Sequence, residues 1–498
     1  MAWGAFPAYL ESRPRERIIG VWDCKPSSMI VTEDGELRSA ATWEELVTSM
    51  AMGEIGMDLH IEAMKRFPYM KEAISDKRAT VGCNQEGELG GVEVRIGRRR
   101  MWIGSLQSWG MKVATMGAAV LIRQLCDYMG EGTRQSPAAV GQASMRRLVA
   151  KPAHGWRRKV PCWQLRQMLQ TGGVGARNDT WAGEGEYFPV AYEIDMDDAY
   201  LWGIQHIPDG VPLLIRHGES LVEEDHCRLS DLGRSMGTWF GQAVVWIPDT
   251  GLTSKVSPLP FKDKGRITQP VKPGWYGHEP DHPVFLFKED VEDCLEAGML
   301  VWLKGPQWAW TEMSSCMKPW AEHMVEKRAN ASSDLEGLCK LSIVAAIGWH
   351  GQKPQRRKVV PLKDALETDS EMICTVGEGA DPTLYSVEVT RWESMPYMTH
   401  WYWHDQMNVR RWLRRITMER EALGDVLIST NTDSVIFATR MKMTLALVPL
   451  HARLPGHGRA WEDGPRLKIG RLTNVTIPYP RAVVAAEKVR LPGTVRLP

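Results

Sequence analysis

Two β-rich segments far apart in the chain each lead to an aspartate, and they constrain the fold more than any other feature. Residues 190–194 form a short strand-like run that ends at Asp195, and the residues from Asp198 onward predict a helix. Residues 426–437 contain two β-branched runs around a polar turn, which predicts a hairpin with Asp433 at its tip. One aspartate at a turn is usually a cap. Two strand-end aspartates from distant segments are what a two-metal site requires, because Mg²⁺ is held by carboxylates together with substrate phosphates.

The length and charge of the chain limit its class. At 498 residues the chain is long enough for about three structural lobes. Its 61 basic and 61 acidic residues exclude a chain that binds nucleic acid through bulk charge, so any such binding must come from local patches. No apolar run is long enough to predict a membrane span. The nine cysteines are scattered without a CxxC pair, which predicts reduced thiols and a cytoplasmic protein, in the host cytoplasm if the chain is viral.

One basic segment has two interpretations. Residues 146–159 carry six basic side chains and no acidic one, with His154 and Trp156 among them. A charge run is usually a solvated face. Basic residues interleaved with flat rings are also what a groove along a phosphate backbone needs, and the sequence leaves both interpretations open.

Other segments indicate a mixed α/β chain. Strand-like runs at 17–21, 92–96 and 101–103, with a helical run at 113–129, predict an α/β lobe at the start. Residues 317–349 are helical in pattern, and residues 351–361 resemble a linker. Residues 402–421 predict a helix with four arginines along one side.

Three motifs, in order along the chain, resemble those of family B DNA polymerases. Residues 195–201, Asp-Met-Asp-Asp-Ala-Tyr-Leu, resemble the first palm motif, D-x-x-S-L-Y-P. Residues 340–348 look like the fingers motif, K-x-x-x-N-S-x-Y-G, and residues 429–434 look like the second palm motif, Y-x-D-T-D-S. Gly172 and Gly173 resemble the Y-x-G-G element that contacts template. The resemblance covers roughly residues 165–498, and small, often protein-primed phage-type members are the closest in size.

The resemblance implies an α/β and α+β multidomain fold, a right-hand polymerase with an N-terminal RNase H-like lobe of exonuclease type. The implied divisions are a degenerate exonuclease-like domain (1–160), the first part of the palm (161–316), the fingers (317–352), the second part of the palm (353–445) and a thumb-like region (446–498).

The resemblance also implies roles for single residues. Asp195 and Asp433 would bind two Mg²⁺ ions, with Mn²⁺ as an alternative, and the Met196 carbonyl would complete the site. Tyr200 is similar to the residue whose ring blocks a ribose 2′-OH. The remaining implied contacts are to the triphosphate (Arg328, Lys340) and to nucleic acid (Gly172, Gly173, Thr432, Ser434, Arg471).

The chain departs from the family at several positions. Asn431 replaces the first Asp of D-T-D, and Val344 and Ile347 replace the Asn and Tyr that line the nascent base pair. Asp23 and Lys25 stand where proofreading members have D-x-E, and a lysine at a metal-ligand position repels the ion. We therefore expect an exonuclease-like lobe without its catalytic carboxylates.

The sequence thus favours a DNA-directed DNA polymerase that uses primer-template DNA and deoxynucleoside triphosphates, and two alternatives remain. The resemblance leaves open a priming protein, a primase or other replication proteins as further partners. The first alternative is an inactive, polymerase-shaped nucleic-acid-binding subunit, which Asn431, Val344 and Ile347 favour. The second is a two-metal nuclease.

Overall fold

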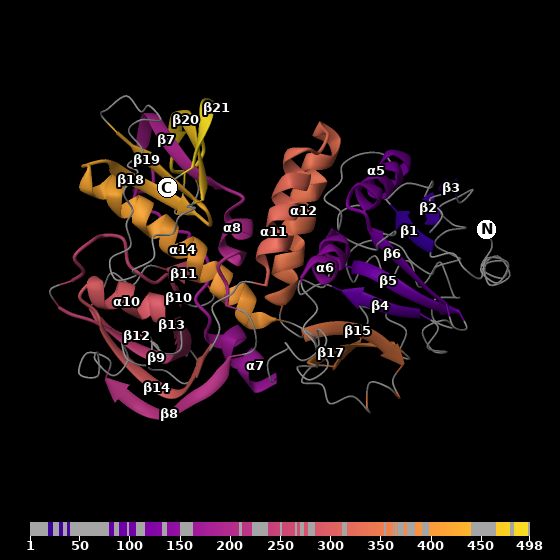
Figure 1. Ribbon diagram of the computed structural model, residues 1–498, viewed down its shortest axis with the longest axis horizontal. Coiled ribbons are helices and arrows are strands. Elements are labelled where there is room, and N and C mark those ends of the chain that lie inside the picture. Colours follow the sequence, from indigo (N-terminus) through magenta and orange to yellow (C-terminus); the bar gives the residue numbers. More distant parts are fainter. Residues whose placement is uncertain are drawn as a thin grey trace. The chain divides into compact units, whose positions relative to one another are not determined.

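The computed structural model divides the chain into two compact units (Figure 1). The first comprises Met1–Leu148 and Glu326–Met395, and the second comprises Val149–Val325 and Pro396–Pro498. The structure describes residues 18–22, 29–32, 37–39, 79–83, 89–96, 99–105, 115–131, 137–149, 163–208, 212–221, 238–249, 251–263, 266–268, 273–276, 284–310, 316–352, 355–361, 363, 366, 373–375, 384–390, 398–439, 465–478 and 483–496. Most of the basic segment, from residue 150 onward, lies outside these ranges.

Nine of the described strands form one sheet in the first unit, and they come from two distant parts of the chain. In order across the sheet they are β16 (Ile373–Thr375), β17 (Leu384–Thr390), β15 (Gln355–Pro361), β4 (Ala79–Cys83), β5 (Leu89–Ile96), β6 (Arg99–Ser105), β1 (Ile18–Trp22), β2 (Met29–Thr32) and β3 (Leu37–Ser39). The prediction of a linker at residues 351–361 is therefore wrong in part, because residues 355–361 form β15. β15 pairs with β17 along its whole length and with β4 at Arg357 and Lys358, and this pairing supplies partners for its backbone hydrogen-bonding groups.

The strands expected in the first lobe are confirmed as β1, β5 and β6. β1 and β6 run parallel as neighbours in the sheet, with Trp22 opposite Ser105. Asp23 and Lys25 follow β1 in the sequence but lie outside the described residues. The expected helix is confirmed as α5 (Thr115–Tyr128).

The helical pattern at 317–349 is confirmed as two helices, α11 (Lys318–Ala329) and α12 (Ser333–His350). In the first unit α6 (Pro137–Leu148) packs closely on α12, since a Cβ at Gly141 would lie 2.3 Å from the Ser342 carbonyl oxygen. The Gln142 side chain donates to the Ala346 carbonyl oxygen at 2.7 Å. Among the described helices, none has both the length and the apolarity that crossing a bilayer requires.

The second unit contains two five-stranded sheets among its described strands. In the first sheet β9 (Trp239–Ile247) pairs with β12 (Gly274–Tyr276), β13 (Val284–Phe287) and β14 (Leu300–Ala309), and β14 also pairs with β8 (Leu213–Leu221). β9 has alternating burial, which places Ala243, Val245 and Ile247 in one apolar core. Two helices belong to this region, α7 (Trp163–Gly172) and α10 (Lys288–Glu296). A separate two-stranded ribbon joins β10 (Phe261–Asp263) to β11 (Arg266–Thr268).

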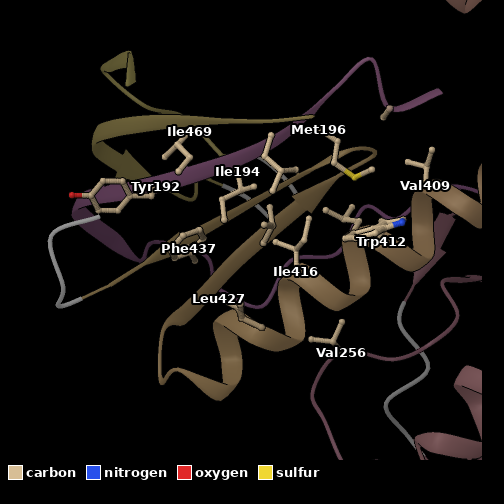
Figure 2. Packing of buried hydrophobic residues seen from close by; sticks show 14 of the residues in the cluster. Tyr192, Ile194, Met196, Val256, Val409, Trp412, Ile416, Leu427, Phe437 and Ile469 are labelled. Atoms are coloured by element: carbon tan, nitrogen blue, oxygen red, sulfur yellow. The ribbon is translucent and has the colours of Figure 1, made fainter. Parts of the chain in front are cut away.

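The second sheet carries both aspartates of interest. Its order is β18 (Val426–Asn431), β19 (Ser434–Ala438), β7 (Tyr187–Asp197), β20 (Arg466–Thr476) and β21 (Glu487–Arg496). The long helix α14 (Thr399–Ala422) and the short helix α8 (Ala199–Ile204) pack against one face. Figure 2 shows Ile194 and Met196 of β7 meeting Trp412 and Ile416 of α14 in the apolar core between them.

Buried ion pairs fasten α14 to α10. The Arg411 guanidinium donates to both carboxylate oxygens of Asp293, at 2.8 and 2.9 Å, and Arg410 pairs with Asp290. Arg410 also donates to the Val174 carbonyl oxygen at 2.6 Å. Charges this deeply buried are tolerated only when paired and hydrogen-bonded. These two arginines of the predicted helix therefore face the protein interior.

Candidate active site

The structure brings Asp195, on β7, next to Asp433, in the turn that leads into the neighbouring antiparallel strand β19. β7 pairs with β19 so that Asp195 lies opposite Ser434. The Met196 backbone N–H donates to the Asp433 carbonyl oxygen at 2.9 Å, while the Met196 side chain is buried in the core (Figure 2). Both aspartates are partly exposed. Two carboxylates from segments more than 200 residues apart thus reach the same end of one sheet.

The hairpin turn that carries Asp433 has a defined shape. Thr432 has a φ of 57°, which is unusual for a β-branched residue. Its backbone N–H donates to the Arg177 carbonyl oxygen at 2.7 Å, and the Ser434 hydroxyl donates to the Asn431 carbonyl oxygen at 3.4 Å. Thr432 and Ser434 therefore stabilise the turn itself. Asn431 is exposed beside Asp433.

An extra extended segment supports this hairpin, and the sequence analysis missed it. Arg177 lies opposite Thr432 and Thr180 lies opposite Ser429, so residues 177–180 run antiparallel along β18. Arg177 is fully buried, and its guanidinium donates to Asp179 at 2.8 Å and to the Ser257 carbonyl oxygen at 2.6 Å. Burial lowers the pKa of Arg177, and the neighbouring Asp179 carboxylate opposes this shift. No local pattern distinguishes this arginine from a surface one.

Alternation along β7 separates an apolar face from an acidic face. Tyr192, Ile194 and Met196 enter the core beneath α14. Because successive side chains of a strand point to opposite faces, Glu193, Asp195 and Asp197 share the other face. The candidate site therefore lies on the face of the sheet opposite α14.

Two lysines neutralise part of this acidic face. Lys468 lies directly opposite Asp195 in the sheet, and its Nζ is 2.5 Å from Asp197 Oδ1. Lys488 forms an ion pair with Glu193. Lys468 is a site residue that the sequence analysis missed. Arg471, which it proposed instead, lies opposite Tyr192 and is exposed, so the structure does not place it on the face of Asp195.

Tyr200 lies on the first turn of α8, near Asp405 of α14 and near Asp433 of the hairpin turn. Asp198 adopts a left-handed conformation with a φ of 54° and turns the chain from β7 into α8. The pKa of Tyr200 is raised by burial and by the nearby carboxyls of Asp405 and Asp433. The Gln406 side chain opposes this rise in the pKa. Tyr200 therefore lies near Asp433, one of the two candidate metal ligands.

Asp405 and Gln406 of α14 lie near Tyr200, although the sequence offers no signal for them. Asp405 is completely buried, and neither carboxyl oxygen has a hydrogen-bond partner in the described part of the chain. Burial raises the pKa of Asp405 well above its usual value. The carboxyl is therefore held in its neutral form over a wider pH range than an exposed aspartate.

Gly172 and Gly173, the two glycines predicted to contact template, lie at the end of α7. A Cβ at Gly173 would lie 2.5 Å from the Trp403 ring and 2.5 Å from the Leu169 carbonyl oxygen. Gly173 also forms an isolated bridge with Phe285. Close packing against α14 thus requires a glycine at position 173. Gly172 is buried as the last residue of α7.

The remaining predicted residues belong to the first unit, whereas Asp195, Asp433 and Tyr200 belong to the second. Arg328, near the end of α11, lies 3.6 Å from Glu336 of α12. Lys340 is exposed on α12, as is Val344 one turn later, whereas Ile347 is buried. Arg328 and Lys340 thus occur on two consecutive helices.

The oxygen donors at the end of β7 fit magnesium ions that a bound substrate helps to hold. Mg²⁺ is usually bound by one or two carboxylates together with water and substrate phosphates. Asp195 and Asp433 supply the two carboxylates, and the Asn431 amide is exposed beside them. Within the described residues, no cluster of three or more His, Cys, Asp or Glu side chains is placed to hold an ion by itself.

Comparison with known proteins gives a likeness of fold. No protein-family model matches the chain, and no curated protein sequence matches it. Phi29 DNA polymerase complexed with primer-template DNA matches with a TM-score of 0.62 at 9% identity, over 94% of this chain and 87% of that chain. The fold is similar to that of Phi29 DNA polymerase.

Two further complexes of the same polymerase agree. The complex with single-stranded DNA has a TM-score of 0.59 at 9% identity, over 95% of this chain and 89% of that chain. The ternary complex with primer-template DNA and incoming nucleotide has a TM-score of 0.59 at 11% identity, over 94% and 87% of the two chains. The mixed α/β architecture expected from the sequence is therefore confirmed at the level of a polymerase-like fold.

Proposed function

We propose that this protein is a DNA-directed DNA polymerase of family B type. The observation that carries the proposal is the juxtaposition of Asp195 and Asp433 at one end of a sheet, in a chain whose fold is similar to that of Phi29 DNA polymerase. The three ordered sequence motifs support the same function. In this proposal the second sheet and α14 form the palm, and the chain also has fingers, a thumb and an N-terminal exonuclease-type lobe.

The proposed reaction is in-line attack of a primer 3′-OH on the α-phosphate of a deoxynucleoside triphosphate. A new O–P bond forms, and pyrophosphate leaves. The Asp195 and Asp433 carboxylates and the Met196 carbonyl oxygen would hold two Mg²⁺ or Mn²⁺ ions, which would supply stabilisation of charge on the attacking and leaving oxygens. Arg328 and Lys340 contribute positive charge toward the triphosphate.

Tyr200 has the role of sugar selection in this proposal. It follows Asp195 by five residues, and its hydroxyl lies near Asp433, so its ring is close to the sugar of a nucleotide bound at the carboxylates. A ring at that position would clash with a ribose 2′-OH but not with a deoxyribose.

The proposed DNA contacts involve several parts of the second unit. Gly172 and Gly173 are assigned to the template, and Thr432, Ser434 and Arg471 to the primer-template. Lys468 is added to this set because it lies opposite Asp195 on the same face of the sheet. The N-terminal lobe is proposed to lack proofreading. A priming protein, a primase and other replication proteins are candidate partners, and a phage or mobile element and the cytoplasm are the proposed setting.

A second candidate is a non-catalytic nucleic-acid-binding subunit with a polymerase shape. Two observations favour it: Asn431 stands where the family has an aspartate, and Lys468 neutralises Asp197 beside the site. A two-metal nuclease is a third candidate, because paired carboxylates also serve hydrolysis.

Template-directed primer extension separates these functions. A labelled primer is annealed to four templates that differ in the first unpaired base, and each deoxynucleotide is offered singly with Mg²⁺. The proposal predicts one-nucleotide extension only by the complementary deoxynucleotide. A bound but unextended primer would favour the binding subunit, and a shortened primer would favour the nuclease.

A further inference from the structure

The turn that presents Asp433 is held from one side by the segment 177–180. Thr432 has a left-handed backbone, with a φ of 57°, which is costly for a β-branched residue and persists only where surrounding contacts fix it. Two acceptors of the segment hold its N–H, the Arg177 carbonyl oxygen at 2.7 Å and Asn178 Oδ1 at 3.2 Å. Because Thr432 directly precedes Asp433, the placement of the segment affects the placement of Asp433.

The side chain of Thr430 completes the pairing between this segment and the hairpin. The Thr430 N–H donates to the Asp179 carbonyl oxygen at 2.8 Å. The Asp179 N–H donates to the Thr430 hydroxyl at 2.9 Å, whereas a regular antiparallel pair returns this bond to the backbone carbonyl oxygen. Thr430 is buried. The pairing therefore depends on a hydroxyl side chain at position 430, three residues before Asp433.

The segment is anchored on its other side to the loop that contains Ser257 and Pro258. The buried Arg177 guanidinium donates to the carbonyl oxygens of these two residues, at 2.6 and 3.3 Å, and to Asp179 Oδ2 at 2.8 Å. β18 is the outermost of the described strands of its sheet, so the segment supplies its partners on that side. A buried anchor of this kind permits little adjustment, and the hairpin is therefore held against a fixed support.

We propose that Thr430 is a positioning residue: its hydroxyl locks the segment 177–180 onto β18 and thereby sets how strongly Asp433 holds a metal ion. The inference rests on the proposed polymerase function and deepens it, since Thr430 stands at a position that the second palm motif leaves unspecified. Loss of the hydroxyl leaves the Asp179 N–H without this acceptor and loosens the left-handed turn. The net strength of one such hydrogen bond corresponds to a change of about two- to tenfold.

The test compares Thr430→Val, which keeps the side-chain shape without the hydroxyl, with Thr430→Ser, which keeps the hydroxyl. Mn²⁺ binding is measured by electron paramagnetic resonance in the presence of the complementary deoxynucleotide and a primer-template whose primer ends in a dideoxynucleotide, so that no reaction occurs. Thr430→Val should raise the half-saturating Mn²⁺ concentration by about two- to tenfold and lower kcat of extension by a similar factor, with unchanged DNA affinity. Thr430→Ser should recover both values to within about twofold of the wild type.

Hydrogen exchange gives a readout of the turn that is independent of metal and of activity. The amides of Thr430 and Thr432 should exchange slowly in the wild type, and exchange at Thr432 should be faster in Thr430→Val, because the left-handed turn has lost part of its support.

Thr417→Val is the matched control, because it removes a buried hydroxyl that donates to the Leu413 carbonyl oxygen at 2.6 Å within α14. It should leave Mn²⁺ binding, kcat and exchange at the turn unchanged.

Wild-type Mn²⁺ binding and wild-type exchange in Thr430→Val would overturn the inference, as would an equal defect in Thr430→Ser. If Thr430→Val did not fold, the wild type would decide, since rapid exchange at both Thr430 and Thr432 would overturn the inference and slow exchange would support it. A wild type that incorporates no nucleotide would overturn the proposed function, whereas the exchange measurement would still decide whether Thr430 holds the turn.

Discussion

Replacing Asp405 with asparagine removes a buried carboxyl whose ionisation opposes folding. Asp405 is completely buried on α14 without a hydrogen-bond partner in the described part of the chain, and burial raises its pKa well above 3.8. In the unfolded chain the carboxyl loses its proton near the usual pKa, whereas in the folded protein it keeps the proton to higher pH. Between these two pKa values the folded state binds more protons, so the free energy of unfolding falls as pH rises.

The pH dependence of the free energy of unfolding is set by the one proton that Asp405 binds in the folded state. A difference of one bound proton changes the free energy of unfolding by about 1.4 kcal/mol per pH unit. The wild type should therefore lose stability relative to Asp405→Asn by about this amount per unit, up to the folded-state pKa of Asp405. The buried amide of the variant adds a constant difference, which does not alter the slope.

His404 must be separated from this effect because it titrates with the opposite sign. Burial, His206 and His400 lower the pKa of His404 to about 3, from the ordinary 6.5. Its contribution to stability is present above pH 6.5 and is lost as pH falls toward 3. Because the wild type and the Asp405 variants all keep His404, its contribution cancels in the difference between their stabilities.

Urea unfolding at several pH values from about 4.5 to 8, upward from the ordinary aspartate pKa, provides the assay, with tryptophan fluorescence as the signal. Trp202 and Trp412, with ring centroids 5.6 Å apart, report on the contact between α8 and α14. Asp405→Ala serves as a second variant without the carboxyl and should show the same altered slope. Parallel pH dependences in the wild type and both variants would refute the assignment of a buried, neutral Asp405.

Three further predictions concern the site and its surroundings. Gly173→Ala should destabilise the protein by about 1–3 kcal/mol, because its Cβ would lie 2.5 Å from the Trp403 ring, and an unchanged melting temperature would contradict this packing. Asn431→Asp should support incorporation at lower Mg²⁺ concentration, since it adds an exposed carboxylate beside Asp433; a higher Mg²⁺ requirement would count against the proposed site. The wild type should leave a mismatched primer 3′ end intact while it extends matched ends, and shortening that depends on Asp23 would show an active exonuclease.

Local patterns were sufficient to predict the elements that carry the two aspartates. The run at residues 190–194 and the hairpin at 426–437 are short-range signals, and both are confirmed as parts of β7 and of β18 with β19. Their pairing was not visible in either segment alone. The ordered motifs suggested it, and the register of Asp195 opposite Ser434 establishes it in the structure.

The residues that the sequence did not reveal depend on contacts between distant segments. Lys468 reaches Asp197 across 271 positions, and Asn408 reaches Gly203 across 205. Asp405 lies in an aromatic helix where nothing local indicates that a carboxyl would be completely buried. Arg410 and Arg411 face inward because α10 supplies Asp290 and Asp293, which no helical periodicity within α14 could indicate.

Nucleotide incorporation by aspartate variants tests the central claim most directly. Single-turnover addition of the complementary deoxynucleotide is measured with Mg²⁺ for the wild type, Asp195→Asn, Asp433→Asn and the exposed control Asp249→Asn, with primer-template affinity measured in parallel. The account predicts that Asp195→Asn and Asp433→Asn each lose at least about a hundredfold in rate, because each removes a metal ligand that acts in the transition state, while DNA affinity changes little. The control should retain the wild-type rate. Wild-type rates in either site variant would contradict the claim that Asp195 and Asp433 together form the catalytic centre.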